Sequence, residues 1–220
     1  MWTIQTVGNN VFYNCPTINS IYVGVNYQSI TFGTKSIIKA SGTCGFNVYY
    51  HISDDKTSLS IYGIGNMINW NFDSNNQLNV FYRPWHNYRE TITSIKIGYG
   101  MTNIGTGTFY YLTKITSLTI PETVIKLGNN VCEKCYLLNT LIIKSRSLST
   151  IDYNCFNFCP ELKSMSYYGS TIPTCFVSGN TGECNNCHFC DSSCNILGNM
   201  QVTKQYQGTS FCELNVTKSL

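Results

Sequence analysis

The sequence predicts a β-dominated solenoid of the α/β class, with a parallel strand ladder, coils of about 23 residues and a β-rich N-terminal cap. Three observations predict this fold class. A short apolar motif recurs at nearly constant spacing, columns of apolar residues keep step with it, and residues 42–91 interrupt the rhythm. A cap is expected because the end of a solenoid otherwise exposes apolar side chains and unpaired strand edges.

The recurring motif reads Leu-x-x-Leu-x-Leu, with other aliphatic residues at some leucine positions. Its last three positions alternate with period two, which predicts a short strand with one buried face. Two outlying copies begin at Ile18 and Leu197. The central copies follow one another at a nearly constant step, and their strands are expected at 95–97, 118–120, 141–143 and 165–167.

Five columns of apolar residues separate successive strands and describe how each coil turns back. A single coil cannot bury these side chains, so stacked coils are expected to bury them as one continuous strip. The residues after the second column, Gly105, Gly128 and Asp152, predict a tight turn in each coil. The columns are Met101, Val124 and Leu148; Ile104, Leu127 and Ile151; Phe109, Cys132 and Phe156; Leu112, Cys135 and Cys159; and Ile115, Leu138 and Leu162.

Four parts of the chain differ in pattern. The cap alternates through 48–52, turns at 54–56 and then becomes rich in aromatic residues, so we expect a compact β-rich unit. Residues 21–39 match residues 200–218 at a constant offset of 179, which predicts that one kind of closing coil occurs twice. The expected parts are 1–41, the last repeat and tail of a preceding array; 42–91, the β-rich cap; 92–170, the repeats; and 171–220, a Cys-rich terminal repeat and tail.

Charge and composition exclude several function classes. Charged residues make up 11% of the chain and the net charge is +3, whereas Asn, Ser and Thr are abundant. No two cations are adjacent, so the chain lacks the clustered Lys and Arg that neutralise nucleic-acid phosphates. No stretch approaches the roughly 20 apolar residues of a membrane span. We therefore expect no nucleic-acid partner and no membrane span in this chain.

The two signals for the cellular compartment disagree. The first residues lack the basic and apolar regions of a signal peptide, and no anchor is visible. The 12 cysteines, however, suit an oxidising compartment better than the cytosol. The chain is therefore expected to be a piece of a longer protein, or to leave the cell by another route.

The repeat resembles the unit of the BspA-like leucine-rich repeat proteins of bacteria and protists. Residues 120–138, which read IPETVIKLGNNVCEKCYLL, match that unit nearly position by position, although Cys132 stands where the family has Phe. The resemblance covers residues 1–30 and 42–170 well and residues 171–220 loosely. It implies a leucine-rich repeat solenoid with a cell-surface or secreted adhesion and antigen role, and without catalysis.

The C-terminal cysteines allow three interpretations. Cys184, Cys187, Cys190 and Cys194 are spaced like the cluster ligands of bacterial ferredoxins, but Asn195 follows where Pro is usual. Zinc could be bound by the same thiols together with His188. We favour disulfides in a loop-rich terminal unit, with no metal and no other cofactor. The pairing stays open, because six cysteines allow fifteen connectivities. The expected disulfide cysteines are Cys175, Cys184, Cys187, Cys190, Cys194 and Cys212.

Cysteines also occur inside the repeats. Cys15, Cys135 and Cys159 occupy one column. A small apolar thiol suits a tight inward position, so we interpret all three as core residues rather than reactive thiols.

Catalysis is not expected, because no nucleophile elbow, zinc-binding helix or phosphate loop occurs and the three histidines are scattered. We expect a non-catalytic binding module of a surface adhesin, with a protein or glycan ligand on host or neighbouring cells. The rival hypothesis is an intracellular leucine-rich repeat scaffold with reduced or zinc-bound cysteines. The candidate binding residues lie on the outer face of the strand ladder and are Ser94, Lys96, Ser117, Thr119, Thr140, Ile142, Ser164 and Ser166.

Overall fold

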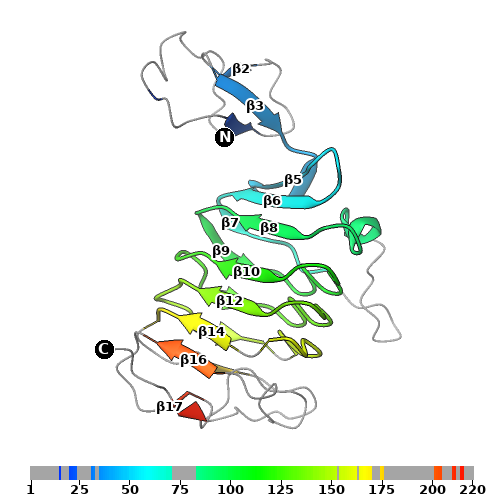
Figure 1. The fold of residues 1–220 in the computed structure, drawn as a ribbon. Coiled ribbons are helices and arrows are strands. Elements are labelled where there is room, and N and C mark those ends of the chain that lie inside the picture. Colours follow the sequence, from blue (N-terminus) through cyan, green and yellow to red (C-terminus); the bar gives the residue numbers. More distant parts are fainter. Residues whose placement is uncertain are drawn as a thin grey trace.

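Strands make up nearly all of the regular structure, and the described part of the chain contains no α-helix. Figure 1 shows the strands stacked one below another, from the N-terminal sheet to the C-terminal strands. The structure is a computed structural model, which describes residues 15, 20–23, 31–32, 35–70, 83–152, 154–162, 164–169, 174–175, 201–204, 210–211 and 214–215.

Residues 42–63 form an antiparallel arrangement that continues into the repeats. β4 (Gly42–Gly45), β5 (Val48–Ile52) and β6 (Ser58–Gly63) are antiparallel neighbours. β6 then pairs in parallel with β8 (Ser94–Ile97). The apolar alternation within β5 buries one face of this unit, so its last strand can serve as the first parallel partner of the repeats.

Two buried tryptophans connect this unit to the first repeat. Trp85 is fully buried and directly precedes the 3-10 helix η2 (His86–Tyr88). Its ring centroid lies 5.3 Å from that of Tyr50 and 5.6 Å from that of Trp70. Its indole N–H donates to the carbonyl of Thr108 at 2.8 Å. This hydrogen bond matters because burying the indole N–H without an acceptor would be costly.

The predicted strand ladder is present as a sheet of four parallel strands. β10 (Ser117–Ile120), β12 (Thr140–Ile143), β14 (Ser164–Tyr167) and β16 (Gln201–Lys204) pair in that order, and β8 contacts β10 (Figure 1). The buried members of each strand face their equivalents in the next. Paired residues include Leu118 with Leu141, Leu141 with Met165, and Met165 with Val202.

A second parallel sheet, which the sequence analysis did not predict, forms where each chain segment turns back. β7 (Gly65–Asn66), β9 (Met101–Ile104), β11 (Lys126–Leu127), β13 (Thr150–Ile151) and β15 (Thr174–Cys175) pair in parallel. Most of these strands contain only two residues. The turns expected at Gly105, Gly128 and Asp152 come directly after β9, β11 and β13. The repeats that carry β10, β12 and β14 therefore each contribute one strand to the ladder and one to the second sheet, whereas β8 pairs with β6.

The core lies between the two sheets and is continuous from the cap to the last described repeat. All fifteen side chains of the five predicted columns are buried, and none is more than 3% exposed. They belong to one apolar cluster that extends from Cys44 to Tyr167. The residues of the five columns therefore share one continuous apolar core.

The repeats also share an unusual backbone conformation at two positions. Gly107, Asn130 and Asn154 occupy equivalent positions and have φ of 65°, 54° and 56°. Tyr111, Lys134 and Phe158 form a second such row, with φ of 58°, 60° and 53°. Glycine and asparagine tolerate this left-handed region, whereas aromatic residues and lysine rarely adopt it. The matching conformation at each step shows that successive loops follow the same path.

The two predicted closing units contain the same hairpin. At the N-terminal end β1 (Ser20–Val23) is parallel to β3 (Lys35–Lys39), which is antiparallel to β2 (Thr31–Phe32). At the other end β17 (Ser210–Phe211) is antiparallel to β18 (Leu214–Asn215). Phe32 pairs with Lys35 and Phe211 with Leu214, so both hairpins have the same register at the offset of 179.

The N-terminal sheet contacts the cap through a few side chains. The hydroxyl of Tyr62 donates to the carbonyl of Val23 at 3.0 Å, and the ring centroids of Tyr62 and Tyr22 lie 4.8 Å apart. The imidazole Nδ1 of His51 lies 2.9 Å from the carbonyl oxygen of Lys39. These contacts are polar or partly exposed, and the main apolar cluster contains no described residue of this sheet.

Candidate binding faces

The outer face of the strand ladder carries short polar side chains in register. Along β10 the residues alternate between exposed and buried, and β12 follows the same alternation apart from half-buried Ile142. Backbone pairing places Ser117 beside Thr140 and Thr119 beside Ile142. Because strand neighbours lie about 4.8 Å apart, these side chains form two rows of closely spaced groups.

The structure assigns positions to all eight predicted binding residues. Ser94, Lys96, Ser117, Thr119 and Thr140 are exposed, and Ile142 and Ser166 are half-buried. Ser164 pairs with Thr140 along the backbone, and its side chain lies outside the described residues. Those on β10, β12 and β14 are brought together by the register. Ser94 and Lys96 pair instead with β6, at the end of the same stack.

Few charges interrupt this ladder face. The Lys96 ammonium lies 5.9 Å from the centre of the Tyr22 ring, close enough for a cation–π interaction. The hydroxyl of Thr140 donates to the side-chain oxygen of Asn139 at 2.8 Å. The ladder face therefore offers hydroxyl groups and small apolar side chains rather than a patch of like charges.

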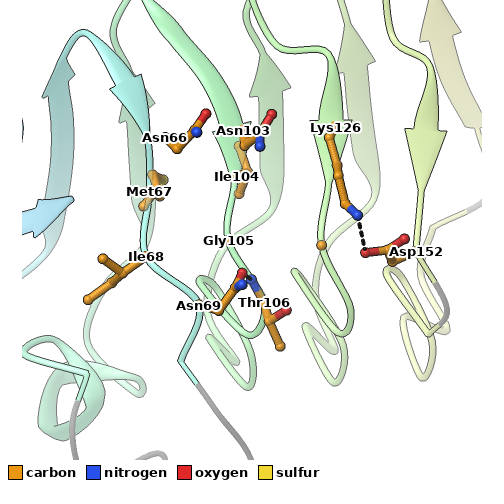
Figure 2. Close-up of a pocket in the computed structure, with 11 residues that line it drawn as sticks. Asn66, Met67, Ile68, Asn69, Asn103, Ile104, Gly105, Thr106, Lys126 and Asp152 are labelled. Atoms are coloured by element: carbon orange, nitrogen blue, oxygen red, sulfur yellow. Dashed lines mark hydrogen bonds and ion pairs between the residues drawn. The ribbon is translucent and has the colours of Figure 1, made fainter. Parts of the chain in front are cut away.

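A second candidate site is a polar groove beside the second sheet, which sequence analysis missed. Its volume is about 550 Å³, and Figure 2 shows side chains from successive repeats along it. Its polar groups come from several repeats, so no local sequence motif predicts it. The lining residues are Asn66, Met67, Ile68, Asn69, Asn103, Ile104, Gly105, Thr106, Lys126, Gly128 and Asp152.

The polar groups of the groove are partly paired with one another. The Lys126 ammonium and the Asp152 carboxylate form an ion pair at 3.0 Å, as the dashed line in Figure 2 marks. The backbone N–H of Thr106 donates to the side-chain oxygen of Asn69 at 2.9 Å. Asn66 accepts a hydrogen bond from the hydroxyl of Thr102 at 2.6 Å. Among the described residues, no acceptor pairs with the amide NH2 groups of Asn66 and Asn69, so both can donate to a ligand.

The polar groups of the groove are suited to binding. Its ionisable side chains are one lysine and one aspartate, which are paired with each other. That ion pair engages the one amine and the one carboxylate of the lining with each other. Amide and hydroxyl groups instead suit hydrogen bonds to a polar ligand.

The cysteines within the repeats are core residues with little reactivity in the folded protein. Cys135 and Cys159 are buried, as expected, whereas Cys15 is only half-buried. Burial raises the pKa of the Cys132 thiol to about 11, and it raises that of Cys44, which lies in β4 before the repeats, to about 12. As thiols they are therefore protonated at neutral pH and poor nucleophiles.

The predicted disulfide unit lies almost entirely outside the described residues. Only the backbone of Cys175 is described, and it pairs with Ile151 in the second sheet. Within the described ranges, no group of three or more His, Cys, Asp and Glu side chains is arranged to hold a metal ion. In the same ranges, no helix has the length and apolar character needed to cross a membrane. The other five cysteines, Cys184, Cys187, Cys190, Cys194 and Cys212, stay a prediction.

Comparison with known proteins identifies the repeat. The profile of the BspA type leucine rich repeat region matches in six copies, over residues 2–37 and 85–205. Among solved structures, a leucine-rich repeat protein from Eubacterium ventriosum is similar, with 15% sequence identity and a TM-score of 0.49. The similarity covers 75% of this chain and 43% of that protein, so the chain spans less than half its length. No curated protein is similar enough to count as a relative.

Repeats of this type mediate protein binding, and proteins that carry them are typically extracellular or associated with the cell surface. The matched residues make up well over half of the sequence. The chain therefore belongs to the BspA-type leucine-rich repeat family.

Proposed function

We propose that the chain is a non-catalytic repeat module of a cell-surface or secreted adhesin or antigen, which binds a protein or glycan on its ladder face. The observation that carries this proposal is the in-register exposure of Ser117, Thr119 and Thr140 above a fully buried apolar row. Such rows present a rigid, regular surface whose side chains lose little entropy on binding. The family supports the surface location.

The proposal includes one continuous solenoid with coils of about 23 residues, within the usual range of leucine-rich repeats. Support comes from the backbone register, which pairs Leu118 with Leu141 and Leu141 with Met165 at nearly the same step along the chain. The second sheet repeats this step, since Ile104 pairs with Leu127 and Leu127 with Ile151. Two parallel sheets that advance together are typical of stacked coils.

The chemistry of the ladder face favours a broad contact with many weak hydrogen bonds. Serine and threonine hydroxyls both donate and accept, so they suit backbone groups of a protein or hydroxyls of a glycan. The low charge argues against electrostatic capture, which needs extended patches of one sign. The ligand is therefore expected to bind with little dependence on salt.

The experiment uses surface variants that leave the fold intact. We expect Thr119→Arg combined with Thr140→Arg to weaken binding to cultured epithelial cells and to a glycan array by at least tenfold, because bulky charges cover the centre of the ladder face. Ser147→Arg, an exposed change in the loop after β12, is the matched control and should bind like the wild type. Equal binding by all three proteins would contradict a role for the ladder face.

The groove supports a second candidate site, for a hydroxyl-rich ligand such as a saccharide. Amide groups of Asn66, Asn69 and Asn103 line one side of it, and the Lys126–Asp152 pair lines the other (Figure 2). We expect Asn103→Leu to abolish glycan-array signals that arise in the groove, while the ladder variant retains them. Signals lost in the ladder variant alone would assign the glycan to the ladder face instead.

A further inference from the structure

Cys132 departs from its repeat column and meets a second cysteine as a result. The equivalent residues in the neighbouring repeats are Phe109 and Phe156, both buried aromatic side chains. Cys135, three residues later, occupies the next column. A phenylalanine would fill the space between the two columns, whereas the shorter Cys132 leaves its sulfur directed at that of Cys135. The sequence motif is therefore Cys-Glu-Lys-Cys within one turn of one coil.

The two sulfur atoms are closer than separate thiols pack. Their Sγ atoms lie 2.6 Å apart, and both residues are fully buried. Non-bonded carbon atoms pack at about 3.5–4.0 Å, and sulfur is larger than carbon. The observed separation is only about 0.6 Å more than the length of a disulfide bond. No water or ligand fits between them, and a small rotation of either side chain brings the sulfurs to bonding distance.

Two further thiols, those of Cys155 and Cys159, lie near this pair, and that of Cys159 is engaged differently. The thiol of Cys159 donates to the carbonyl of Cys132 at 3.1 Å, and that of Cys135 lies 3.2 Å from the carbonyl of Phe109. Cys159 thus points to the backbone of the preceding repeat, although its thiol also interacts with that of Cys135. The short contact between the other two sulfur atoms makes Cys132 the best-placed partner for Cys135.

We propose that Cys132 and Cys135 form an intramolecular disulfide that closes this turn of the coil. The two thiols lose two protons and two electrons, and a small-molecule disulfide such as oxidised glutathione accepts them. One thiolate attacks the oxidant and releases one reduced thiol. The second thiolate then attacks the mixed disulfide, forms the Cys132–Cys135 bond and releases the second reduced thiol.

The cross-link forms before the coil closes. In the folded protein both thiols are inaccessible, and burial raises the pKa of each, so a thiolate is scarce. The buried guanidinium of Arg83, whose Nη1 donates to the carbonyl of Gly107 at 2.8 Å, only partly offsets this effect on Cys132. Once formed, the bond is shielded from reductants for the same reason.

Peptide mapping tests the proposal directly, because Lys134 lies between the two cysteines. Trypsin yields residues 127–134 and residues 135–144, each with one cysteine. Protein folded in a glutathione redox buffer is alkylated in denaturant and digested without reductant. We expect one species that contains both peptides and separates into the two on reduction. Alkylation of both cysteines, or linkage of residues 135–144 to residues 147–163, would overturn the proposal.

Variants supply a second readout that does not depend on digestion. Cys132→Ser and Cys135→Ser should each expose one additional titratable thiol in denaturant, because each leaves its partner unpaired. The matched control is Cys132→Phe with Cys135→Leu, which restores residues found in the same columns of other repeats. The change in melting temperature on adding dithiothreitol during folding should be smaller in this control than in the wild type. An equal change in both would show that the pair is not cross-linked.

Discussion

At the scale of single residues, Glu133 is the clearest case among the described carboxylates of a charge placed where water is scarce. The residue is only 8% exposed, and the amide of Asn130 donates to its carboxylate. Burial raises the pKa of the Glu133 carboxyl despite that hydrogen bond. A carboxyl group whose folded pKa exceeds its unfolded value, about 4.3, stabilises the fold most at low pH. That contribution is lost as the pH rises through the folded pKa.

Replacement of this carboxyl by an amide therefore has a pH-dependent effect. We expect Glu133→Gln to raise the melting temperature relative to the wild type more at pH 8 than at pH 4.5, because only the wild type then buries a charge. Melting curves of both proteins at the two pH values provide the measurement. The exposed Glu122→Gln is the control. A smaller difference in melting temperature between Glu133→Gln and the wild type at pH 8 than at pH 4.5 would show that the wild type buries no unfavourable charge there.

Two neighbouring residues of β12 give the sharpest contrast between the buried and exposed faces. Leu141 is fully buried and Thr140 is exposed. We expect Leu141→Asp to cost several kcal/mol, since it buries an unpaired carboxylate. Thr140→Asp should change the unfolding free energy by no more than about 0.5 kcal/mol. Denaturant titration of both variants measures the difference, and equal losses would show that the register is wrong.

At the scale of elements, glycine sets how closely the repeats approach beside the groove. A side-chain Cβ on Gly105 would lie 1.9 Å from the carbonyl oxygen of Ile68, and one on Gly128 would lie 2.7 Å from the backbone nitrogen of Thr106. Neither neighbour can rotate away, because both are backbone atoms. In the next repeat the position is Asp152, whose carboxylate pairs with Lys126. At this position two repeats thus make a close backbone contact, whereas the third forms an ion pair.

Alanine at these two positions should separate the strands. We expect Gly105→Ala to cost about 1–3 kcal/mol, as overpacking usually does, and Gly128→Ala to cost less. Thermal unfolding, with a loss of roughly 2–4 °C for each kcal/mol in a chain of this size, provides the ranking. Melting temperatures equal to that of the wild type in both variants would show that the backbone contacts of Gly105 and Gly128 do not limit how closely the repeats approach.

The elements that the sequence predicted are those with a strong local signal. β10, β12 and β14 alternate over several residues and recur at a fixed step, so the pattern alone identifies them. β11 and β13 contain two residues each, too few for any periodicity, and the second sheet was therefore missed. The groove was missed for a related reason. Its polar groups come from separate repeats and meet only when those repeats stack.

At the scale of the whole molecule, the C-terminal segment raises the question of what covers the last repeats. Leu162, Met165 and Tyr167 are buried at that end of the described core. The sequence from Cys175 to Cys212 is polar and Cys-rich, so its apolar area is too small to offset its chain entropy. We expect disulfides there, each adding about 2–4 kcal/mol.

Metal analysis and thiol counting distinguish the two ways of stabilising this segment. Protein purified without reductant should contain no stoichiometric zinc or iron, and the cysteines between 175 and 212 should be blocked when titrated in denaturant. Near-stoichiometric metal with reduced thiols would contradict the disulfides. It would also favour the intracellular scaffold, because zinc–thiolate sites suit a reducing compartment.

The main apolar cluster begins at Cys44, so we predict that the chain from Gly42 onward folds as one cooperative unit. The N-terminal sheet contacts this unit through Tyr22, Val23 and Lys39, mainly by single hydrogen bonds and by contacts between aromatic rings. A truncation that starts at Gly42 removes about a fifth of the chain. Melting enthalpy scales with the number of residues that unfold together. If the N-terminal sheet unfolded together with the rest of the chain, the truncation would therefore lower the melting enthalpy by about a fifth. We expect a distinctly smaller loss by calorimetry, and a loss of a fifth or more would show that the N-terminal sheet belongs to the same cooperative core.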